Sequence, residues 1–354
     1  MLIAILNDTH AGLRNASDVF LDYIAKFYSD VFFPYCKENK ITQIIHLGDY
    51  YDHRKYVNFK ALNHNRKTFL EPMRELGMTM DIIPGNHDVV YKNTNELCSL
   101  KELLGYFVEN VNIVMQPKVI SYDGCNIAML PWINQENHAV SMKFIETCNA
   151  SIIGSHLELN GFDMIKGMPS HSGMDPSIFS RFEQVWSGHY HTKSTKGNIH
   201  YLGTQFEMTW SDAGDWKYFH VFNTETRELT AIRNPHEIYC KCIYDDVRQD
   251  PEDLDTSNAK GKFVKVVVVN KTDFFKFDRF IDKLQKQDPF EIKIAENYDE
   301  FSGANVTAES VDAVTDTAAL MDTYVDAVET ELSKDLIKSK LRELYTEAQN
   351  LEVV

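Results

Sequence analysis

The stretch ITQIIHLGDYYD, residues 41–52, decides the fold because a short apolar run leads directly into a Gly-Asp pair. Short runs that are rich in Ile and bounded by Gly, Pro or Asp are typical of buried strands. The same pattern occurs at residues 2–6, which precede Asp8, and at residues 80–83, which precede Asn86. We therefore expect three buried strands, each followed at once by a polar side chain.

Two weaker strand patterns, at residues 151–153 and 185–186, also lead into polar segments. Loops that leave the carboxyl ends of sheet strands can converge although they lie far apart in the sequence. Five short segments stand at such ends: Asp8-Thr9-His10, Gly48-Asp49-Tyr50-Tyr51-Asp52, Gly85-Asn86-His87-Asp88, Gly154-Ser155-His156 and Gly188-His189-Tyr190-His191. Each segment alone is an ordinary turn, but all five in this order predict one common site.

The side chains in these segments predict a site for two metal ions. Carboxylates, an amide and imidazoles suit Mn, Fe or Zn, and no thiolate stands among them. Two ions held roughly 3.5–4 Å apart need a bridging ligand, and Asp49 has two oxygens for that role. The expected ligand sets are Asp8, His10 and His191 for one ion and Asn86, His156 and His189 for the other. Such ions polarise phosphoryl oxygens and lower the pKa of a water that attacks phosphorus in line.

His87 follows a predicted ligand and is expected to point elsewhere from its loop. We interpret His87 as the catalytic residue that stabilises the transition state or protonates the leaving oxygen. Asp52 is expected to hold His87 in the tautomer that this role requires.

The order DxH, GDxxD, GNHD, GxH and GHxH resembles the calcineurin-like metallophosphoesterase superfamily. Within it, the chain is most similar to the SbcD-type DNA repair nucleases and to the recombination endonuclease subunits of tailed phages. Further matching stretches are residues 156–161, 185–191 and 201–204. The resemblance implies a β-sandwich flanked by helices and Mn²⁺-dependent exonuclease and endonuclease activity on DNA. It also implies a homodimer and an SbcC-type ATPase partner with long coiled coils.

One position departs from part of that family. Archaeal and eukaryotic relatives place a catalytic His three residues after the bridging Asp, whereas this chain has Asp52 there, followed by His53. Bacterial relatives also carry Asp at this position. The departure therefore leaves the activity in place and the role of His53 open.

The charge of the chain limits how it binds DNA. The 354 residues carry a net charge of −16. Residues 299–354 contribute 13 acidic against 4 basic residues, and the rest of the chain carries −7. Because no basic stripe of the kind that drives strong DNA binding is present, we expect a partner to supply much of the affinity. No apolar run reaches the ~20 residues of a membrane helix. The six scattered cysteines indicate reduced thiols in the cytoplasm, that of the host cell if the protein is phage-encoded.

The sequence predicts three parts. Residues 1–235 form the nuclease domain, with helical patterns at 17–37 and 60–76 between strands, so an α/β sandwich is expected. Residues 236–298 form a small α+β capping domain, with strands at 237–244, 262–269 and 290–295 and a helix at 273–287. The family resemblance implies that this domain helps to position DNA, and a domain that only stabilises the chain is the alternative. Residues 299–354 are a linker and a helical tail.

The tail carries apolar residues with coiled-coil spacing. Steps of three and four residues connect Val311, Val314, Ala318, Met321, Val325, Val328 and Leu332. Ser333 can cap a second helix, whose apolar positions are Ile337, Leu341, Leu344, Ala348 and Leu351. An apolar stripe on a short tethered helix pair needs a partner surface, and the family resemblance implies the coiled-coil base of the ATPase. Packing against the chain's own domain is the alternative.

Two other functions stay open. A protein phosphatase or small-molecule phosphodiesterase of the same superfamily is the first, because residues 48–54 are close to the phosphatase pattern GDxxDRG, with His53 inserted before Arg54. The second is an assembly subunit whose metal site is vestigial. The presence of every ligand type argues against that loss of function.

Overall fold

The structure is a computed structural model that describes residues 1–105, 109–165, 168–296, 321–322, 324–326 and 332–350. The described chain divides into two compact units. The first contains Met1–Phe206 and Trp216–His236, and the second contains Glu207–Asp215 and the described residues from Glu237 onward. Each unit is considered by itself below.

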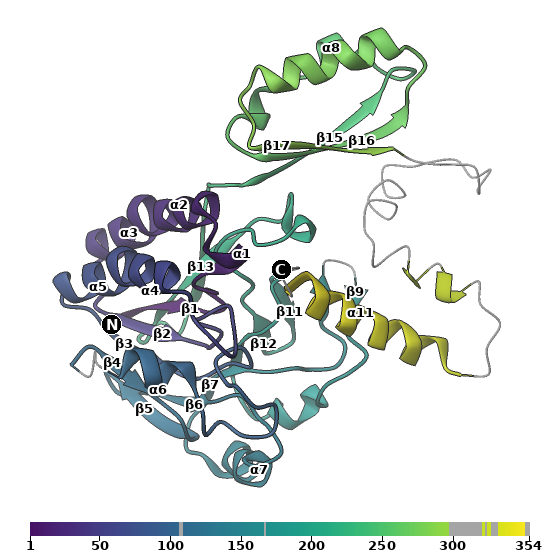
Figure 1. The fold of residues 1–354 in the computed structure, drawn as a ribbon. Helices are drawn as coiled ribbons and strands as arrows, with labels where there is room; N and C mark the ends of the chain where they lie inside the picture. Colours follow the sequence, from purple (N-terminus) through teal and green to yellow (C-terminus); the bar gives the residue numbers. More distant parts are fainter. Residues whose placement is uncertain (106–108, 166–167, 297–320, 323, 327–331, 351–354) are drawn as a thin grey trace. The chain divides into compact units, whose positions relative to one another are not determined.

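The first unit is built on two six-stranded mixed sheets (Figure 1). The first sheet has the order β14 (Leu229–Arg233), β13 (Tyr218–Asn223), β1 (Leu2–Leu6), β2 (Gln43–His46), β3 (Thr79–Ile82) and β4 (Val111–Ile113). Strands β1 to β4 are parallel, and β13 runs antiparallel to β1. The strand patterns before Asp8, Asp49 and Asn86 are therefore confirmed as three adjacent parallel strands.

The second sheet has the order β11 (Ser194–Lys196), β12 (Ile199–Tyr201), β10 (Gln184–Gly188), β7 (Ile152–His156), β6 (Cys125–Leu130) and β5 (Lys118–Tyr122). A separate pair of short strands is formed by β8 (Asp163–Ile165) and β9 (Met168–Pro169). The two six-stranded sheets share one apolar core, in which Ile5 and Ile45 of the first sheet lie with Ile127, Met129 and Trp186 of the second. The predicted sandwich is confirmed.

Helices flank the sandwich, as predicted (Figure 1). They are α1 (Leu13–Ala16), α2 (Asp18–Phe27), α3 (Phe33–Glu38), α4 (Phe59–Asn65), α5 (Glu71–Glu75), α6 (Ser99–Leu104) and α7 (His138–Thr147). The two predicted long helices are each continuous but widen to a π-helical turn in the middle, at Tyr28–Phe32 and Arg66–Leu70. These turns place Phe32 and Phe69 in an aromatic core, where Phe32 lies 5.2 Å from the Phe219 ring of β13.

The second unit contains a three-stranded parallel sheet of β15 (Tyr239–Asp245), β16 (Phe263–Asn270) and β17 (Glu291–Glu296). Helix α8 (Phe274–Gln285) covers one face of it through Phe277, Phe280 and Leu284. Asp273 caps α8 by accepting hydrogen bonds from the backbone amides of Phe275 and Lys276. All four elements lie within two residues of the predicted bounds. Short 3₁₀ turns lie at Trp210–Asp212, Pro251–Asp253 and Ser257–Ala259 in this unit and at Pro176–Phe179 in the first.

The described part of the tail is helical except at Leu332 and Ser333. Helix α11 spans Lys334–Asn350, and the Ser333 hydroxyl accepts a hydrogen bond from the Leu336 amide at 3.4 Å. Residues 321–322 and 324–326 are also helical and pair with α11 through Asp322 with Arg342 and Asp326 with Lys338. Of the first predicted apolar stripe, Val311, Val314, Ala318 and Val328 lie outside the described residues, and so does Leu351 of the second stripe. Among the described helices, none has the length and apolar character that crossing a membrane requires.

Candidate metal centre

Five strand ends bring the seven predicted ligands to one edge of the sandwich. The loop after β1 carries Asp8 and His10, the loop after β2 carries Asp49, and the loop after β3 carries Asn86. From the second sheet, β7 ends at His156, and β10 leads into His189 and His191. Strands β7 and β10 are parallel neighbours, with Gly188 directly opposite His156. The convergence therefore follows from parallel strands that end at the same edge.

The ligand atoms form two clusters. Those of Asp8, His10 and His191 all lie within 4.8 Å of one another, as do those of Asp49, His156 and His189. The Oδ1 atom of Asn86 belongs with the second cluster, because it lies 2.9 Å from both His156 Nε2 and His189 Nδ1. The grouping matches the two sets that the sequence predicts.

Asp49 lies between the two clusters. Its Oδ2 atom is 3.3 Å from His156 Nε2 in one cluster and 3.8 Å from His10 Nε2 in the other. Its Oδ1 atom accepts a hydrogen bond from the His87 amide at 2.7 Å. A carboxylate in this position can reach a cation in either cluster.

Four of these residues hold uncommon backbone conformations. The φ angles are 47° at Asp8, 39° at His10, 54° at Asp49 and 86° at His189, all in the left-handed region. Such conformations cost on the order of 1–3 kcal/mol each and persist where the surrounding structure enforces them. The Gly48 and Gly85 positions help to enforce them, since a Cβ on Gly85 would lie 2.2 Å from Asp49 Oδ1. The Gly residues in two of the predicted segments are therefore required by close packing.

Asp88 organises two of the loops, a role that the sequence pattern did not predict. Its fully buried carboxylate accepts hydrogen bonds from the backbone amides of Asp49 at 2.8 Å, Tyr50 at 3.0 Å and Gly85 at 2.9 Å. It thus joins the loop after β2 to the loop after β3. Its place directly after Asn86-His87 was the only signal in the sequence.

His46 is a second buried residue whose role the sequence pattern did not predict. Its Nδ1 atom accepts from the Gly48 amide at 3.2 Å, so Nε2 carries the proton and donates to the Thr9 hydroxyl at 3.0 Å. The Thr9 hydroxyl donates in turn to the Tyr50 carbonyl. Burial lowers the pKa of His46 to about 3, so the imidazole stays neutral. His46 thereby ties the loop after β1 to the loop after β2.

His87 lies beside the clusters, with its ring edge-to-face against His10 at 4.9 Å. Its Nδ1 atom donates to the backbone carbonyl of Asp52 at 2.8 Å, which leaves Nε2 available to a substrate. The contact predicted between Asp52 and His87 is thus made by the main chain. The Asp52 carboxylate instead lies 3.2 Å from His10 Nδ1. His53 stacks on Tyr56 at 4.6 Å.

The electrostatics of the site favour cations. Burial acts to lower the pKa of His10, but the hydrogen bond to Asp52 and the charge of Asp49 outweigh it and raise the pKa to about 9. Burial also acts to lower the pKa of His156, but the charges of Asp49 and Asp8 outweigh this effect and raise the pKa to about 9. Protons on these imidazoles thus balance the buried carboxylates when no metal is bound.

The residues therefore fit a pair of metal ions. His10 Nε2 is buried and has no hydrogen-bond partner among the described residues. The His156 Nδ1 atom donates to the Leu47 carbonyl at 2.7 Å, which aims Nε2 at Asn86 and Asp49, as is usual for a histidine that binds a metal. The donors are oxygen and nitrogen atoms, the set that Mn, Fe or Zn prefers.

The fold and the site define a metal-dependent phosphoesterase. Residues 1–193 match the model of the calcineurin-like phosphoesterase family. The chain belongs to this family, whose members use a dinuclear metal site. Over 350 residues it is 31% identical to exonuclease subunit 1 of Enterobacteria phage T4, covering 98% of this chain and 99% of that protein. A solved structure of a novel archaeal phosphodiesterase is 16% identical and covers 66% of this chain and all of that one, with a TM-score of 0.35.

Proposed function

We propose that the chain is a Mn²⁺-dependent DNA nuclease, the subunit of a recombination and repair complex that cleaves phosphodiester bonds. The observation that carries the proposal is Asp49 Oδ2 lying within 3.8 Å of the nitrogen ligands of both clusters. The name of the T4 relative, an exonuclease subunit similar over nearly the whole chain, supports DNA as the substrate and a multi-subunit assembly.

In this proposal, Asp8, His10 and His191 would hold one ion, Asn86, His156 and His189 would hold the other, and Asp49 would serve both. When bound, the two cations supply Lewis acidity to a phosphoryl oxygen and to water. The neutral amide oxygen of Asn86 limits the negative charge in the second cluster. Asp88 and His46 hold the loops after β1, β2 and β3 in place before any substrate arrives. Such preorganisation avoids the cost of arranging the ligands during the reaction.

His87 is proposed as the catalytic histidine. Its Nδ1–H is donated to the Asp52 carbonyl, so the ring is oriented by the main chain and Nε2 is the atom that can contact a phosphoryl or leaving oxygen. Asp52 acts on the site in two ways, since its carboxylate also faces His10. Its proposed role therefore widens from orienting His87 to orienting a metal ligand as well.

Cleavage of labelled duplex DNA, compared with hydrolysis of p-nitrophenyl phosphate, tests the substrate class. With Mn²⁺, the full chain should cleave the DNA, and Asp49→Asn should lose this activity. A chain that hydrolyses the monoester rapidly but leaves DNA intact is a phosphatase, and the proposal is then wrong.

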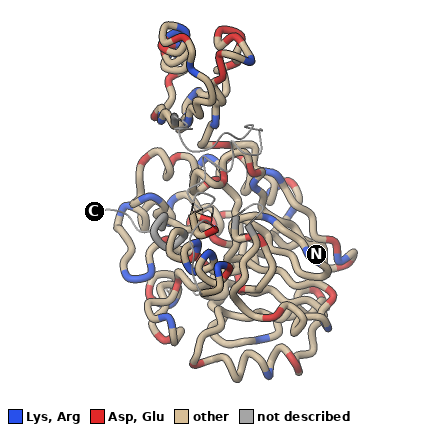
Figure 2. Tube along the Cα trace, turned by 90° about the vertical axis from the view of Figure 1, so that its right-hand side faces the viewer, with Lys and Arg blue, Asp and Glu red and all other residues tan. Residues whose placement is uncertain are grey.

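The distribution of charge supports the need for a partner. Basic residues of the described chain are interspersed with acidic ones in the view of Figure 2. The basic residues that we propose as candidate phosphate contacts are Arg54, Lys55, Lys60, Arg66, Lys67, Lys92, Lys193 and Lys196. Of these, Lys60 is already paired with Asp18 at 2.7 Å. We therefore propose that residues 1–235 cleave DNA and that residues 236–298 and a second protein help to hold it.

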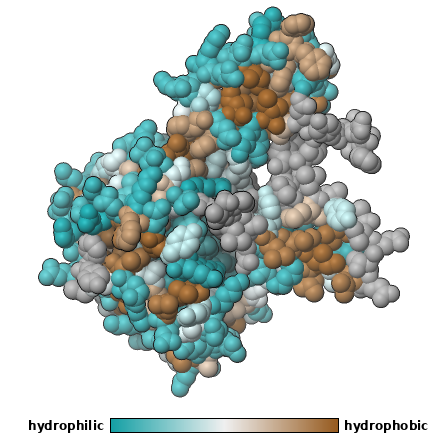
Figure 3. Space-filling view, in the orientation of Figure 1, coloured by the Kyte–Doolittle hydropathy of each residue, from teal (hydrophilic) through white to brown (hydrophobic). Residues whose placement is uncertain are grey.

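The tail is proposed to bind an SbcC-type coiled-coil ATPase. Figure 3 shows apolar side chains gathered over α11, and Leu336 and Leu344 of this helix are 62% and 59% exposed. An exposed apolar helix face is the usual docking surface for a partner helix. Deleting residues 299–354 should spare cleavage of short DNA and abolish co-purification with the ATPase. A point variant with Leu336→Ser and Leu344→Ser should behave likewise, whereas the control Lys340→Ser should not. Retained co-purification in the deletion variant contradicts this part.

A homodimer is also proposed, with α2–α3 and α4–α5 as the candidate faces. Phe59, the first residue of α4, is 87% exposed, which supports the second face. Phe59→Ser should shift the mass measured by sedimentation from dimer to monomer. The six cysteines, all of which are described, form no disulfide, and this supports the proposed cytoplasmic location.

A further inference from the structure

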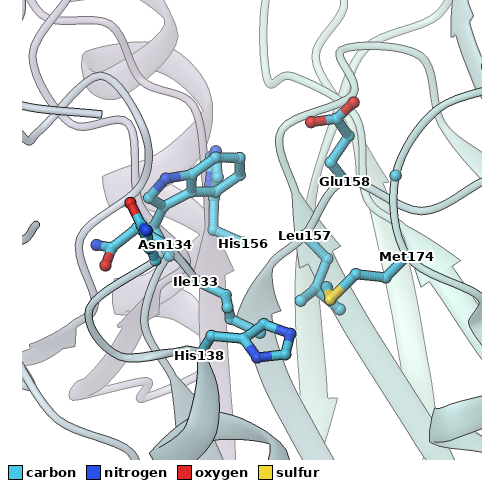
Figure 4. Close-up of a pocket in the computed structure, with 10 residues that line it drawn as sticks. Ile133, Asn134, His138, His156, Leu157, Glu158 and Met174 are labelled. Atoms are coloured by element: carbon cyan, nitrogen blue, oxygen red, sulfur yellow. The ribbon is translucent and has the colours of Figure 1, made fainter. Parts of the chain in front are cut away.

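A cavity adjoins the second ligand cluster and is used by none of the roles above. Its volume is about 450 Å³, which lies within the range of small-molecule sites. His156, a proposed metal ligand, forms part of its lining. An occupant of this cavity would therefore lie directly beside the metal centre. Figure 4 shows the residues around it.

Trp132 lines the cavity and also packs against two of the ligand histidines. The ring centres of Trp132 and His189 are 5.4 Å apart, and those of Trp132 and His156 are 5.9 Å apart. The main chain of Trp132 is fixed on both sides. Its amide donates to the Pro84 carbonyl at 2.9 Å, and its carbonyl accepts from the Asn95 side chain at 3.0 Å. The main chain that carries the indole is thus held in place before any ligand binds.

A network of buried asparagines fixes the segment that follows Trp132. The Asn137 side chain donates to the Trp132 carbonyl at 2.9 Å and accepts from the backbone amide of Asn134 at 2.8 Å. The Asn134 side chain donates to Asn95 Oδ1 at 2.7 Å. All three asparagines are buried. Buried polar networks of this kind rigidify a segment when their members are paired.

Met174 contributes to the lining from the loop that follows β9. Its amide donates to the Glu158 carbonyl at 2.9 Å. Gly173 makes this approach possible, because its φ is +96° and a Cβ there would lie 2.5 Å from the same carbonyl oxygen. Met174 offers a flexible, polarisable surface that packs well on aromatic rings. The Glu158 carboxylate and the His138 ring add polar groups to the lining.

This lining suits a planar heterocycle better than a phosphate. It combines an indole, a thioether and apolar side chains with a few polar groups, and none of its residues is Lys or Arg. Aromatic surfaces of this kind stack bases regardless of sequence, whereas phosphate binding relies on cations or clustered amides. A cavity of this size also has no room for a base that remains stacked in a duplex, so the occupant must be unstacked.

We propose that this cavity, the Trp132 pocket, receives the nucleobase next to the phosphate that is cleaved. The inference rests on the proposed nuclease function and adds a base subsite to it. The phosphate lies on the metal centre while the adjacent base leaves its stack and packs against Trp132 and Met174. The pocket thereby positions the scissile bond without reading a sequence.

An abasic residue tests the pocket without altering the protein. Two oligonucleotides are compared in Mn²⁺, one intact and one with a tetrahydrofuran abasic residue next to a single mapped cleavage position. Cleavage at that phosphate should slow by roughly 5- to 150-fold, the range that loss of one base–aromatic stack produces. Trp132→Ala should cut the intact oligonucleotide that much more slowly and show no further loss with the abasic one.

Two further variants serve as controls for this test. Met174→Ala changes none of the proposed metal ligands and should lose part of the same discrimination, so a poorly folded Trp132→Ala does not decide the outcome. Val140→Ala, on the exposed surface of α7, should discriminate like the unaltered protein. If the unaltered protein cleaves intact and abasic DNA at the same rate, the Trp132 pocket does not receive a base, but the proposed nuclease function is unaffected. Failure to cleave any DNA overturns both.

Discussion

Substitution of Gly85 by Ala should disable the metal centre without unfolding the protein. A Cβ at this position would lie 2.2 Å from Asp49 Oδ1, 2.5 Å from the Asp49 amide nitrogen and 2.8 Å from His156 Cε1. Real Cβ atoms essentially never approach closer than 3.0 Å, so the Asp49 carboxylate must move by at least 0.8 Å. Asp49 Oδ2 lies within 4 Å of histidine ring nitrogens in both clusters.

The expected effect follows from that displacement. A shift of about 1 Å in a catalytic group can cost roughly 100-fold in rate. Overpacking of this kind also destabilises a protein by about 1–3 kcal/mol. Hydrolysis of bis(p-nitrophenyl) phosphate with Mn²⁺ measures the rate without depending on DNA binding, and kcat/KM should fall by roughly 100-fold.

Gly197→Ala is the matched control. Gly197 has a φ of +59°, and a Cβ added there would meet nothing within 4 Å, so alanine adds backbone strain of about 1–2 kcal/mol without a clash. Both variants should lose similar thermal stability, but only Gly85→Ala should lose activity. If Gly85→Ala keeps a kcat/KM within twofold of the unaltered protein, the close packing of the loops does not set the position of Asp49.

Three further outcomes are expected. His87→Gln should slow DNA cleavage by about 10²- to 10⁴-fold. The number of bound Mn²⁺ ions, measured by equilibrium dialysis, should stay the same. Cleavage at the normal rate would show that His87 is not the catalytic histidine. Asp52→Asn should weaken Mn²⁺ binding by about 10- to 100-fold in calorimetry, because its carboxylate faces His10 Nδ1 at 3.2 Å; unchanged affinity contradicts this. Burial raises the pKa of Glu207 to about 7, so the stability that it contributes is present below about pH 4 and lost as the pH rises to 7. In urea unfolding, the free energy of unfolding of Glu207→Gln should exceed that of the unaltered protein by up to about 3 kcal/mol at pH 8 and by little at pH 4. If the two proteins show the same dependence of stability on pH, the raised pKa of Glu207 is refuted.

The sequence predicted the sandwich and the grouping of the seven candidate ligands because both depend on local patterns. Each short apolar run ends in a polar residue, and parallel strands bring such ends together, as β7 and β10 do for His156 and His189. The residue types then divide naturally between two cations. Positions such as Asp49 could therefore be selected without knowing any distance.

Other features could not be predicted because they depend on contacts between distant segments. The role of Asp88 could not be predicted because its carboxylate accepts hydrogen bonds from three backbone amides in two loops, and backbone amides leave no pattern in the sequence. His46 resembles an ordinary strand residue until its bonds to Gly48 and Thr9 are known. The contact from Asp52 to His87 was expected from a carboxylate, but the turn presents the main-chain carbonyl. Trp132 follows no ligand pattern, and only the folded chain places it beside two of the histidines.

The most direct test of the two-metal site is anomalous X-ray diffraction from crystals soaked in manganese. We predict two peaks roughly 3.5–4 Å apart, one beside Asp8, His10 and His191 and the other beside Asn86, His156 and His189, with Asp49 in contact with both. A single peak, or well-ordered side chains around an empty site at saturating Mn²⁺, would contradict it.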